Sequence, residues 1–243
     1  MSWWSKALGL NGLYRGAVVP LLLAVACPNS GIVPAFAADK VIEVDPQHRS
    51  DPVMITKVTL GDSEVQCGLI ASPFQLQPVV PIQAGDDWLQ NVTIYLFNRT
   101  NKKVVYVQIV LGFPETGDGI QRPMRVHHIT LGQLPPSVAV TGSGQPIRRD
   151  LTRKAMSFAP GQTLLIDVGV YFDQIRASVE PKMAFTAITK CIIRRSAFYF
   201  DDGMRWDGEY SVPDPERPGK WKYMDQRYFP GDEHNNWPPR PHK

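Results

Sequence analysis

Two apolar runs in the first half of the chain constrain its fold more than any other feature. In the first run, Val92, Ile94 and Leu96 occupy every second position, and the second run, Val104–Leu111, follows after the polar stretch Asn98–Lys103. Alternation with a period of two is typical of a β-strand whose two faces have different surroundings. The two runs therefore predict two strands, joined either as a hairpin or as a crossing from one sheet to another.

Other stretches are rich in β-branched and aromatic residues and are bounded by glycine, proline or asparagine, as strands commonly are. They predict strands at Met54–Leu60, Glu64–Ile70, Arg125–Leu131, Thr163–Tyr171 and Met183–Phe200. One short helix is expected at Phe172–Glu180, closed by Pro181. No long segment has the 3.6-residue period of an amphipathic helix, and turn signals separate the predicted strands at irregular intervals. The sequence therefore predicts an all-β fold of the β-sandwich type.

Composition narrows the classes of function. The chain has 243 residues, of which 43% are hydrophobic, so it can bury a core without help from a metal ion. Its glycines and prolines are frequent but not periodic, which excludes a collagen-like chain. The formal net charge of +3 is too small for the basic surface that nucleic-acid binding requires, and no nucleic-acid partner is predicted.

The first 37 residues have the pattern of a secretory signal peptide. Lys6 and Arg15 accompany a short apolar run, Ala17–Ala26, and Ala35 and Ala37 supply the small side chains that the peptidase requires before its cut. The apolar run is about half as long as the roughly 20 residues that span a bilayer. We expect cleavage after Ala37, export of the mature chain to the periplasm, cell surface or medium, and no transmembrane helix in it.

A second interpretation of the same region stays open. Leu23–Cys27 loosely resembles a lipobox, in which Cys27 would become lipidated and N-terminal. Ala24 stands where leucine is usual, and Pro28 follows the cysteine, so the match is incomplete. Under either interpretation the mature chain is exported.

Two cysteines, Cys67 and Cys191, remain after cleavage following Ala37. Exported proteins mature under oxidising conditions, in which two cysteines most simply form one structural disulfide. The two are far apart in sequence and do not form a C-x-x-C motif, which argues against a catalytic thiol pair. We therefore predict a Cys67–Cys191 disulfide.

Three sequence passages resemble parts of known exported proteins. WLQNVTIYLFNRTNKKVVYVQI at 88–109 and APGQTLLIDV at 159–168 resemble the immunoglobulin-like modules of secreted bacterial proteins. FYFDDGMRWDGEYSVPDPERPGKW at 198–221 resembles the ending of uncharacterised exported bacterial proteins of this build, with an aromatic-Asp-Asp-Gly-x-x-Trp signature. The resemblance implies an immunoglobulin-like antiparallel β-sandwich with an extended proline- and aromatic-rich C-terminal segment, and it implies no established activity.

The C-terminal segment supplies the candidate binding residues, which are Trp206, Tyr210, Trp221, Tyr223, Tyr228 and Trp237. Their rings either fasten an extended tail onto the sandwich or form a surface that binds a partner or stacks on sugar rings. The Asp-Asp-Gly turn at 201–203 is expected to bring Trp206 and Tyr210 back beside a central strand that ends at Phe200. We expect Trp206 to face inward, and at least one of Trp221 and Trp237 to face outward.

No catalytic or cofactor motif is present, and no cofactor is predicted. Asp201, Asp202 and Asp207 are weak candidates for a hard cation, since their spacing differs from an EF-hand and turn acids are usually solvated. His127 and His128 are adjacent, so in a strand they face opposite sides and do not share one metal ion.

These observations predict a signal peptide at 1–37, a linker at 38–50, a sandwich at 51–210 and an extended tail at 211–243. The favoured function is non-catalytic: an exported binding or structural module that contacts a protein or a cell-envelope polymer. The alternative is a carbohydrate-binding module or, with less support, a glycan-acting enzyme. A coplanar row of exposed rings would favour sugar binding. A cleft that contains two carboxylates would favour the enzyme. Buried rings would favour a structural role.

Overall fold

The structure, a computed structural model, describes residues 38–48, 51–65, 67, 81–118, 123–135, 153–217 and 220–224. These residues belong to one compact unit and form an eight-stranded and a four-stranded sheet. The larger sheet contains β1 (Ala38–Val44), β4 (Ile82–Ala84), β6 (Val104–Phe113), β7 (Arg125–Gly132), β9 (Lys190–Phe200), β10 (Arg205–Trp206), β11 (Tyr210–Pro213) and β12 (Trp221–Tyr223). The smaller sheet contains β2 (Val53–Leu60), β3 (Ser63–Val65), β5 (Val92–Asn98) and β8 (Thr163–Asp167).

The described residues include one short α-helix, α1 (Phe172–Val179), and the 3-10 turns η1 (Trp88–Asn91), η2 (Pro114–Thr116), η4 (Val168–Tyr171) and η5 (Phe185–Ala187). The prediction of an all-β fold is therefore confirmed, and so is the short helix before Pro181. In the described part of the chain, no helix is long and apolar enough to cross a membrane.

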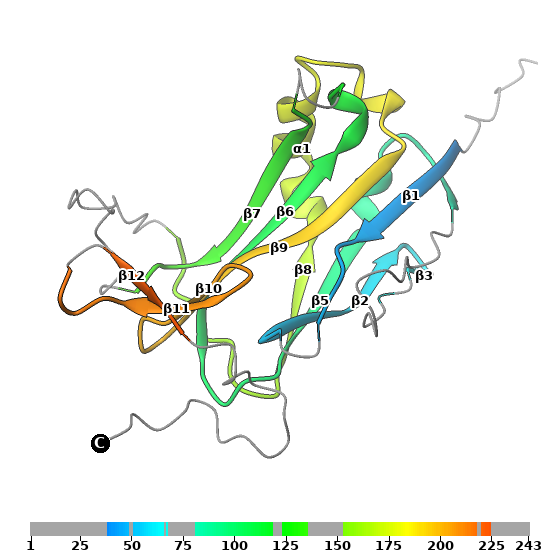
Figure 1. Cartoon of the computed structure of the whole chain (residues 1–243). Coiled ribbons are helices and arrows are strands. Elements are labelled where there is room, and N and C mark those ends of the chain that lie inside the picture. The colour runs from blue at the N-terminus through cyan, green and yellow to red at the C-terminus, as the bar shows by residue number, and fades with distance from the viewer. Residues whose placement is uncertain are drawn as a thin grey trace, which may run out of the picture. The chain divides into compact units, whose positions relative to one another are not determined.

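The polar stretch between β5 and β6 carries the chain from the smaller sheet to the larger one (Figure 1). Asn98 fixes this crossing: its side-chain N–H groups donate to the carbonyls of Lys102 (2.8 Å) and Phe158 (3.0 Å), and its Oδ1 accepts from the hydroxyl of Thr100 (2.8 Å). Asn98 is fully buried, and these bonds satisfy polar groups that burial would otherwise leave unpaired. Of the two connections that the sequence allowed, the chain uses the crossing.

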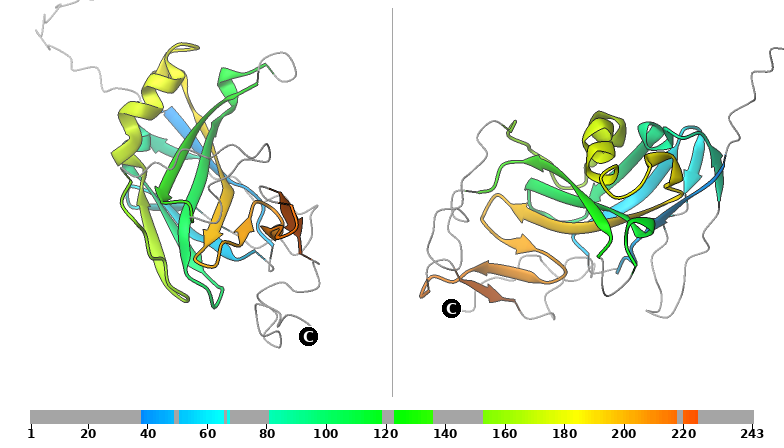
Figure 2. Two further views of the ribbon diagram at one scale, coloured as in Figure 1. Left: turned by 90° about the vertical axis from the view of Figure 1, so that its left-hand side faces the viewer. Right: turned by 90° about the horizontal axis from the view of Figure 1, so that it is seen from above.

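The two sheets enclose one hydrophobic core, because the alternating positions of each strand divide between core and solvent. Figure 2 shows the sheets as two layers with α1 at one side. The smaller sheet contributes residues such as Val58, Ile94 and Leu96, which are at most 1% exposed. The larger sheet contributes Ile109 and Ile193 on neighbouring strands, both with no exposed surface. This shared core is what holds the layers together.

Strand β9 is the centre of the larger sheet. Along one edge it pairs with β6 over most of its length in antiparallel orientation. Along the other edge it pairs first with β1, in parallel, through Lys190–Ile193, and then with β10, in antiparallel orientation, at Phe198 and Tyr199. The prediction that this stretch forms a central strand is confirmed for Lys190–Phe200, whereas η5 occupies part of the expected N-terminal portion.

Two expected boundaries differ from the structure. The segment expected to be a linker contains β1, whose Ile42 and Val44 are buried in the core. The expected tail contributes β11 beyond Tyr210 and also β12, so the larger sheet continues past the predicted end of the sandwich. Charged residues in β1 and prolines near β11 and β12 hid these strands from pattern analysis.

The predicted Cys67–Cys191 disulfide is wrong, because both cysteines are free thiols in the structure. Cys191 lies in β9 and is 1% exposed, packed within the core. The thiol of Cys67, beyond β3, is directed to the carbonyl of Val65 (3.4 Å). Burial raises the pKa of Cys67 to about 11 and raises that of Cys191 as well, so both thiols are protonated and unreactive near neutral pH.

Replacing Trp206 by alanine tests the inward packing of the hairpin after β9. Trp206 is 5% exposed and stacks on Phe198, with ring centroids 5.2 Å apart. We expect Trp206→Ala to lower the free energy of unfolding by about 3–5 kcal/mol, as truncation of a large core side chain does. Urea unfolding of the two proteins measures this. Leu165→Ala, at a side chain that is 57% exposed, should change stability by only about 0.5 kcal/mol, and equal effects of the two substitutions would contradict the packing.

Candidate functional site

The strands after β9 carry aromatic side chains to both faces of the larger sheet. Residues directly opposite one another on paired strands share a face, and Phe198, Trp206 and Tyr210 are such neighbours. All three are buried in the core, so the predicted inward orientation of Trp206 is confirmed. Tyr210 shares that face because it is paired with Trp206 across a tight turn at Gly208, which has a φ of 101°. These two sequence candidates therefore stabilise the fold.

The opposite, outer face of the same strands carries a second group, here called the outer aromatic cluster: Tyr106, Tyr199, Arg205 and Trp221. Tyr106 and Tyr199 are neighbours on β6 and β9, and their rings meet edge to face with centroids 5.3 Å apart. Trp221 on β12 meets Tyr199 in a similar way, at 6.0 Å and an interplanar angle of 68°. All four side chains are half-buried. The cluster thus joins strands that are far apart in sequence.

Arg205 is the charged centre of the outer aromatic cluster. Its guanidinium carbon lies 4.4 Å from the centroid of the Trp221 ring, a cation–π contact. Its Nη2 donates to Asp207 Oδ2 at 2.8 Å. The planar guanidinium is therefore held between a ring and a carboxylate, which limits its rotamers before any partner binds.

Hydrogen bonding within the cluster is incomplete. Burial raises the pKa of Tyr199, although the charge of Arg205 and a hydrogen bond from it act in the opposite direction. The Nε of Arg205 and the Oγ of Ser211 are buried and have no hydrogen-bond partner among the described residues. Ser211 pairs with Arg205 on the adjacent strand, so both atoms lie in the same row across the sheet. Both atoms are covered by the surrounding side chains, so they remain unpaired within the described part of the chain and are not exposed to a partner.

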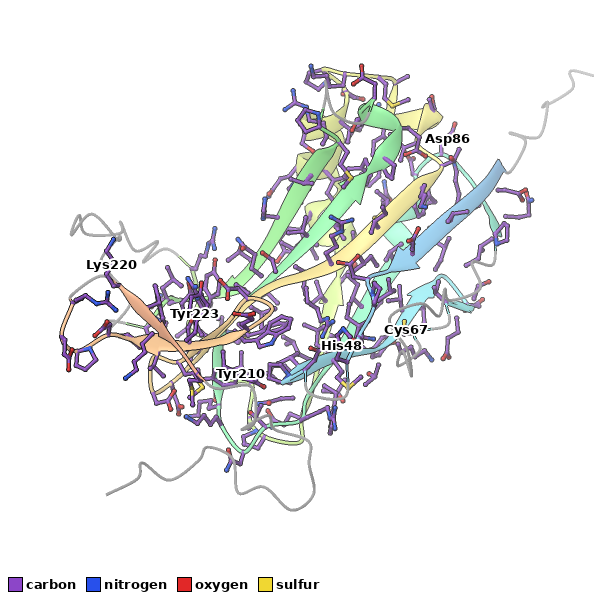
Figure 3. All side chains as sticks on the ribbon, in the orientation of Figure 1. His48, Cys67, Asp86, Tyr210, Lys220 and Tyr223 are labelled. Atoms are coloured by element: carbon purple, nitrogen blue, oxygen red, sulfur yellow. The ribbon has the colours of Figure 1, made fainter. Side chains whose placement is uncertain are left out.

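The remaining sequence candidates have different positions. Tyr223 is 61% exposed and pairs with Ser211 on the neighbouring strand. Figure 3 shows Tyr223 at the β10–β12 end of the larger sheet, and it shows Cys67 beside the smaller sheet. Trp221 is half-buried in the outer aromatic cluster. Tyr228 and Trp237 lie outside the described residues, as do the predicted signal peptide and Cys27.

The three acidic candidates do not gather around one point. Asp202 forms an ion pair with Lys102 and accepts a hydrogen bond from the N–H of Met204 (3.1 Å). Asp207 pairs with Arg205, and Asp201 is an exposed residue of the turn. Among the described residues, no group of three or more His, Cys, Asp or Glu side chains lies close enough to hold a metal ion.

His127 and His128 face opposite sides of β7, as predicted. His128 is exposed and lies opposite Val110, while His127 lies opposite Leu111, with its ring 6.5 Å from that of Tyr171. The Nε2 of His127 is buried without a hydrogen-bond partner among the described residues. Burial, and secondarily the charge of His128, lowers the pKa of His127.

Sequence reasoning missed Tyr106, Tyr199 and Arg205. The available signal was the turn at 201–203, since a tight hairpin closed by Gly203, with a φ of 86°, places Arg205 beside Tyr199. Tyr199 then belongs to the face opposite Phe198 and Phe200. The pairing of Tyr199 with Tyr106 had no local signal, because β6 and β9 are separated by many residues.

Comparisons of this chain with protein-family models, with curated proteins and with solved structures find no match.

The lowered pKa of His127 makes the fold sensitive to acid. The unfolded chain takes up a proton on this histidine near pH 6.5, but the folded chain does so only at lower pH. Stability is therefore lost as pH falls below about 6.5, because the unfolded state binds more protons. We expect His127→Gln to lose less stability than the unsubstituted protein between about pH 7.5 and about pH 5.5. Urea unfolding across that range measures the difference, and parallel stability curves would refute it.

Proposed function

We propose that this chain is an exported, non-catalytic binding module that contacts a protein partner through the outer aromatic cluster. The observation that carries the proposal is the arrangement of Arg205 against Trp221, beside Tyr199 and Tyr106, on a face turned away from the core. Half-buried rings around a pre-oriented cation cost little side-chain entropy when a partner covers them.

The side chains of the cluster are those that protein interfaces favour. Tyrosine, tryptophan and arginine are enriched at the residues that contribute most to protein–protein binding. They combine large apolar area with a polar group. A protein partner offers both apolar side chains and backbone carbonyls to such a surface.

Carbohydrate binding is the second candidate. The exposed ring of Tyr223 favours it, since an open aromatic face can stack on a sugar ring. The geometry of the cluster is less suited to sugar chains: Tyr106 and Tyr199 are nearly perpendicular, at 88°, and Trp221 is inclined by 68° to Tyr199. A polysaccharide platform needs rings that lie in one plane, so we favour the protein partner.

Export and an immunoglobulin-like build complete the proposal. Strand β1 begins at Ala38, the residue after the expected cleavage site, so a mature chain starting there retains every strand of the larger sheet. Two sheets of mostly antiparallel strands around one core are compatible with an immunoglobulin-like sandwich. The parallel pairing of β1 with β9 is a feature that such a sandwich has to accommodate.

The N-terminal sequence of the exported protein tests the export part of the proposal. Expression of the full chain in a bacterial host, followed by Edman sequencing of the exported form, should give a sequence that begins at Ala38. A lipid-modified chain beginning at Cys27 would support the lipoprotein alternative instead. An exported chain that retains Met1 would contradict both.

Substitutions in the outer aromatic cluster test the binding part. A partner captured from the cell envelope by the mature protein is identified, purified and titrated against each variant. We expect Trp221→Ala and Arg205→Lys each to weaken its binding by about tenfold or more, which corresponds to about 1.4 kcal/mol. The lysine keeps the charge but removes the planar contact with the ring.

Tyr95→Ala is the matched control. Tyr95 is a half-buried tyrosine on the outer face of the smaller sheet, with Lys57 Nζ 5.7 Å from its ring centroid, so it reproduces the chemistry at another place. Its substitution should leave binding unchanged, and the thermal midpoints of all variants show whether they are folded. Equal binding by all variants would refute the proposal. A glycan array on which Trp221→Ala loses binding would favour the carbohydrate candidate.

A further inference from the structure

The outer aromatic cluster lies next to the point at which the described chain ends. Trp221 comes three residues before Met224, which corresponds to about 10 Å along a strand. The N–H of Met224 donates to the carbonyl of Tyr210 (2.9 Å), so the chain is held against β11 up to its last described residue. Residues 225–243, which follow, therefore start beside the cluster.

The sequence of residues 225–243 contains a proline-rich recognition motif. Residues 237–241 read WPPRP, in which Pro238 and Pro241 form a P-x-x-P pattern. Segments of this kind bind in the polyproline II conformation, which has three residues per turn and a rise of about 3.1 Å per residue. Bound in this conformation, the two prolines would share one side of the segment, about 9 Å apart. Because proline restricts its own backbone, such a segment loses little conformational entropy when it binds.

The rings of the cluster have an arrangement that suits proline. Tyr106 and Tyr199 meet at 88° and Trp221 is inclined by 68° to Tyr199, with centroids 5.3 Å and 6.0 Å apart. Rings at such steep angles present their faces and edges in different directions, whereas sugar chains need one flat platform. Domains that bind P-x-x-P segments do so with surfaces lined by aromatic side chains. Proline has no N–H, so its ring packs on an aromatic side chain without leaving a donor unpaired.

Residues 225–236 are long enough to bring this motif back onto the cluster. A chain of about 12 residues has an r.m.s. end-to-end distance of about 20 Å and spans at most about 40 Å. The cluster lies within that reach, because Trp221 is about 10 Å from Met224 and the ring of Tyr199 is 6.0 Å from that of Trp221. A short tether of matching length gives an effective concentration in the millimolar range. A second copy of the chain therefore competes poorly at lower protein concentrations.

Building on the proposed function, we propose that residues 237–241 pack across the rings of Tyr106, Tyr199 and Trp221 within the same molecule. The motif is then an internal ligand of the outer aromatic cluster. A protein partner has to displace it before binding, so the C-terminal segment lowers the apparent affinity of the surface for its partner.

Photo-cross-linking in the full mature chain locates the motif. Trp237 is replaced by benzoylphenylalanine, and the cross-linked peptides are identified by mass spectrometry. We expect cross-links within one molecule to the peptides that carry Tyr106 or Tyr199, which are far from residue 237 in sequence. Cross-links only to other peptides would overturn the proposal. A product of dimer mass joined at the same rings would also overturn it, because that result assigns the motif to a second copy.

A peptide of residues 234–243 measures competition for the cluster. Pro238→Ala combined with Pro241→Ala in the full mature chain removes the internal motif, so this chain should bind the peptide about tenfold or more tightly than the unsubstituted chain does. The same two substitutions in the peptide keep its length and charge and should weaken its binding by about tenfold or more. Fluorescence anisotropy measures both effects. Equal binding by the two chains, or of the two peptides, would overturn the proposal.

Substitutions in the chain that carries both alanines show where the peptide binds. Trp221→Ala should weaken peptide binding by about tenfold or more, whereas Tyr95→Ala, at a half-buried tyrosine of the smaller sheet, should not. Thermal midpoints show that the variants are folded, and unchanged affinity with Trp221→Ala would overturn the proposal. If the peptide does not bind but an envelope partner still requires Trp221, the internal ligand is refuted and the proposed function stands. Peptide binding without capture of any envelope partner is the opposite result.

Discussion

The buried ion pair between Arg195 and Asp51 is the contact on which the arrangement of the two sheets depends. Both side chains are at most 7% exposed, and removing such charges from water costs several kcal/mol for each ion. The surroundings offset that cost: Arg195 Nη2 donates to the carbonyl of Pro46 (2.9 Å), and Asp51 accepts from the N–H of His48 (2.6 Å). The pair thereby ties β9 to the segment that leads from β1 in one sheet to β2 in the other.

The same arginine determines where the outer aromatic cluster is built. Along β9, the pairing with β1 ends at Ile193 and the pairing with β10 starts at Phe198, so Arg195 lies between the two. Its guanidinium carbon is 5.3 Å from the ring centroid of Trp206, so the pair also contacts the hairpin after β9. With Trp206 held inward, Arg205 next to it is turned outward. The core contact and the candidate binding surface are thus two faces of one hairpin.

Sequence pattern predicted the elements that depend on local alternation, such as β5, with Ile94 and Leu96 facing inward. It missed β1, because buried Lys40 breaks the expected apolar spacing. Lys40 Nζ donates to the carbonyl of Ile188 (3.1 Å), and Glu115 accepts from the N–H of Thr189 (3.0 Å). Because this carbonyl and this N–H belong to the same peptide group, a cation binds one side of the group and an anion binds the other. A partnership between residues so distant in sequence has no local signal, and neither does the absence of a disulfide.

The buried positions of β9 do not follow one regular alternation along the whole strand. Cys191 and Ile193 are buried at odd positions, whereas Phe198 and Phe200 are buried at even positions, so the inward face changes parity within the strand. A straight strand cannot satisfy both sets, and a β-bulge at Ser196 reconciles them by adding one residue opposite β6. The bulge leaves Arg195 inward and turns Tyr199 outward. A change of parity within one strand therefore marks both the buried ion pair and the aromatic surface.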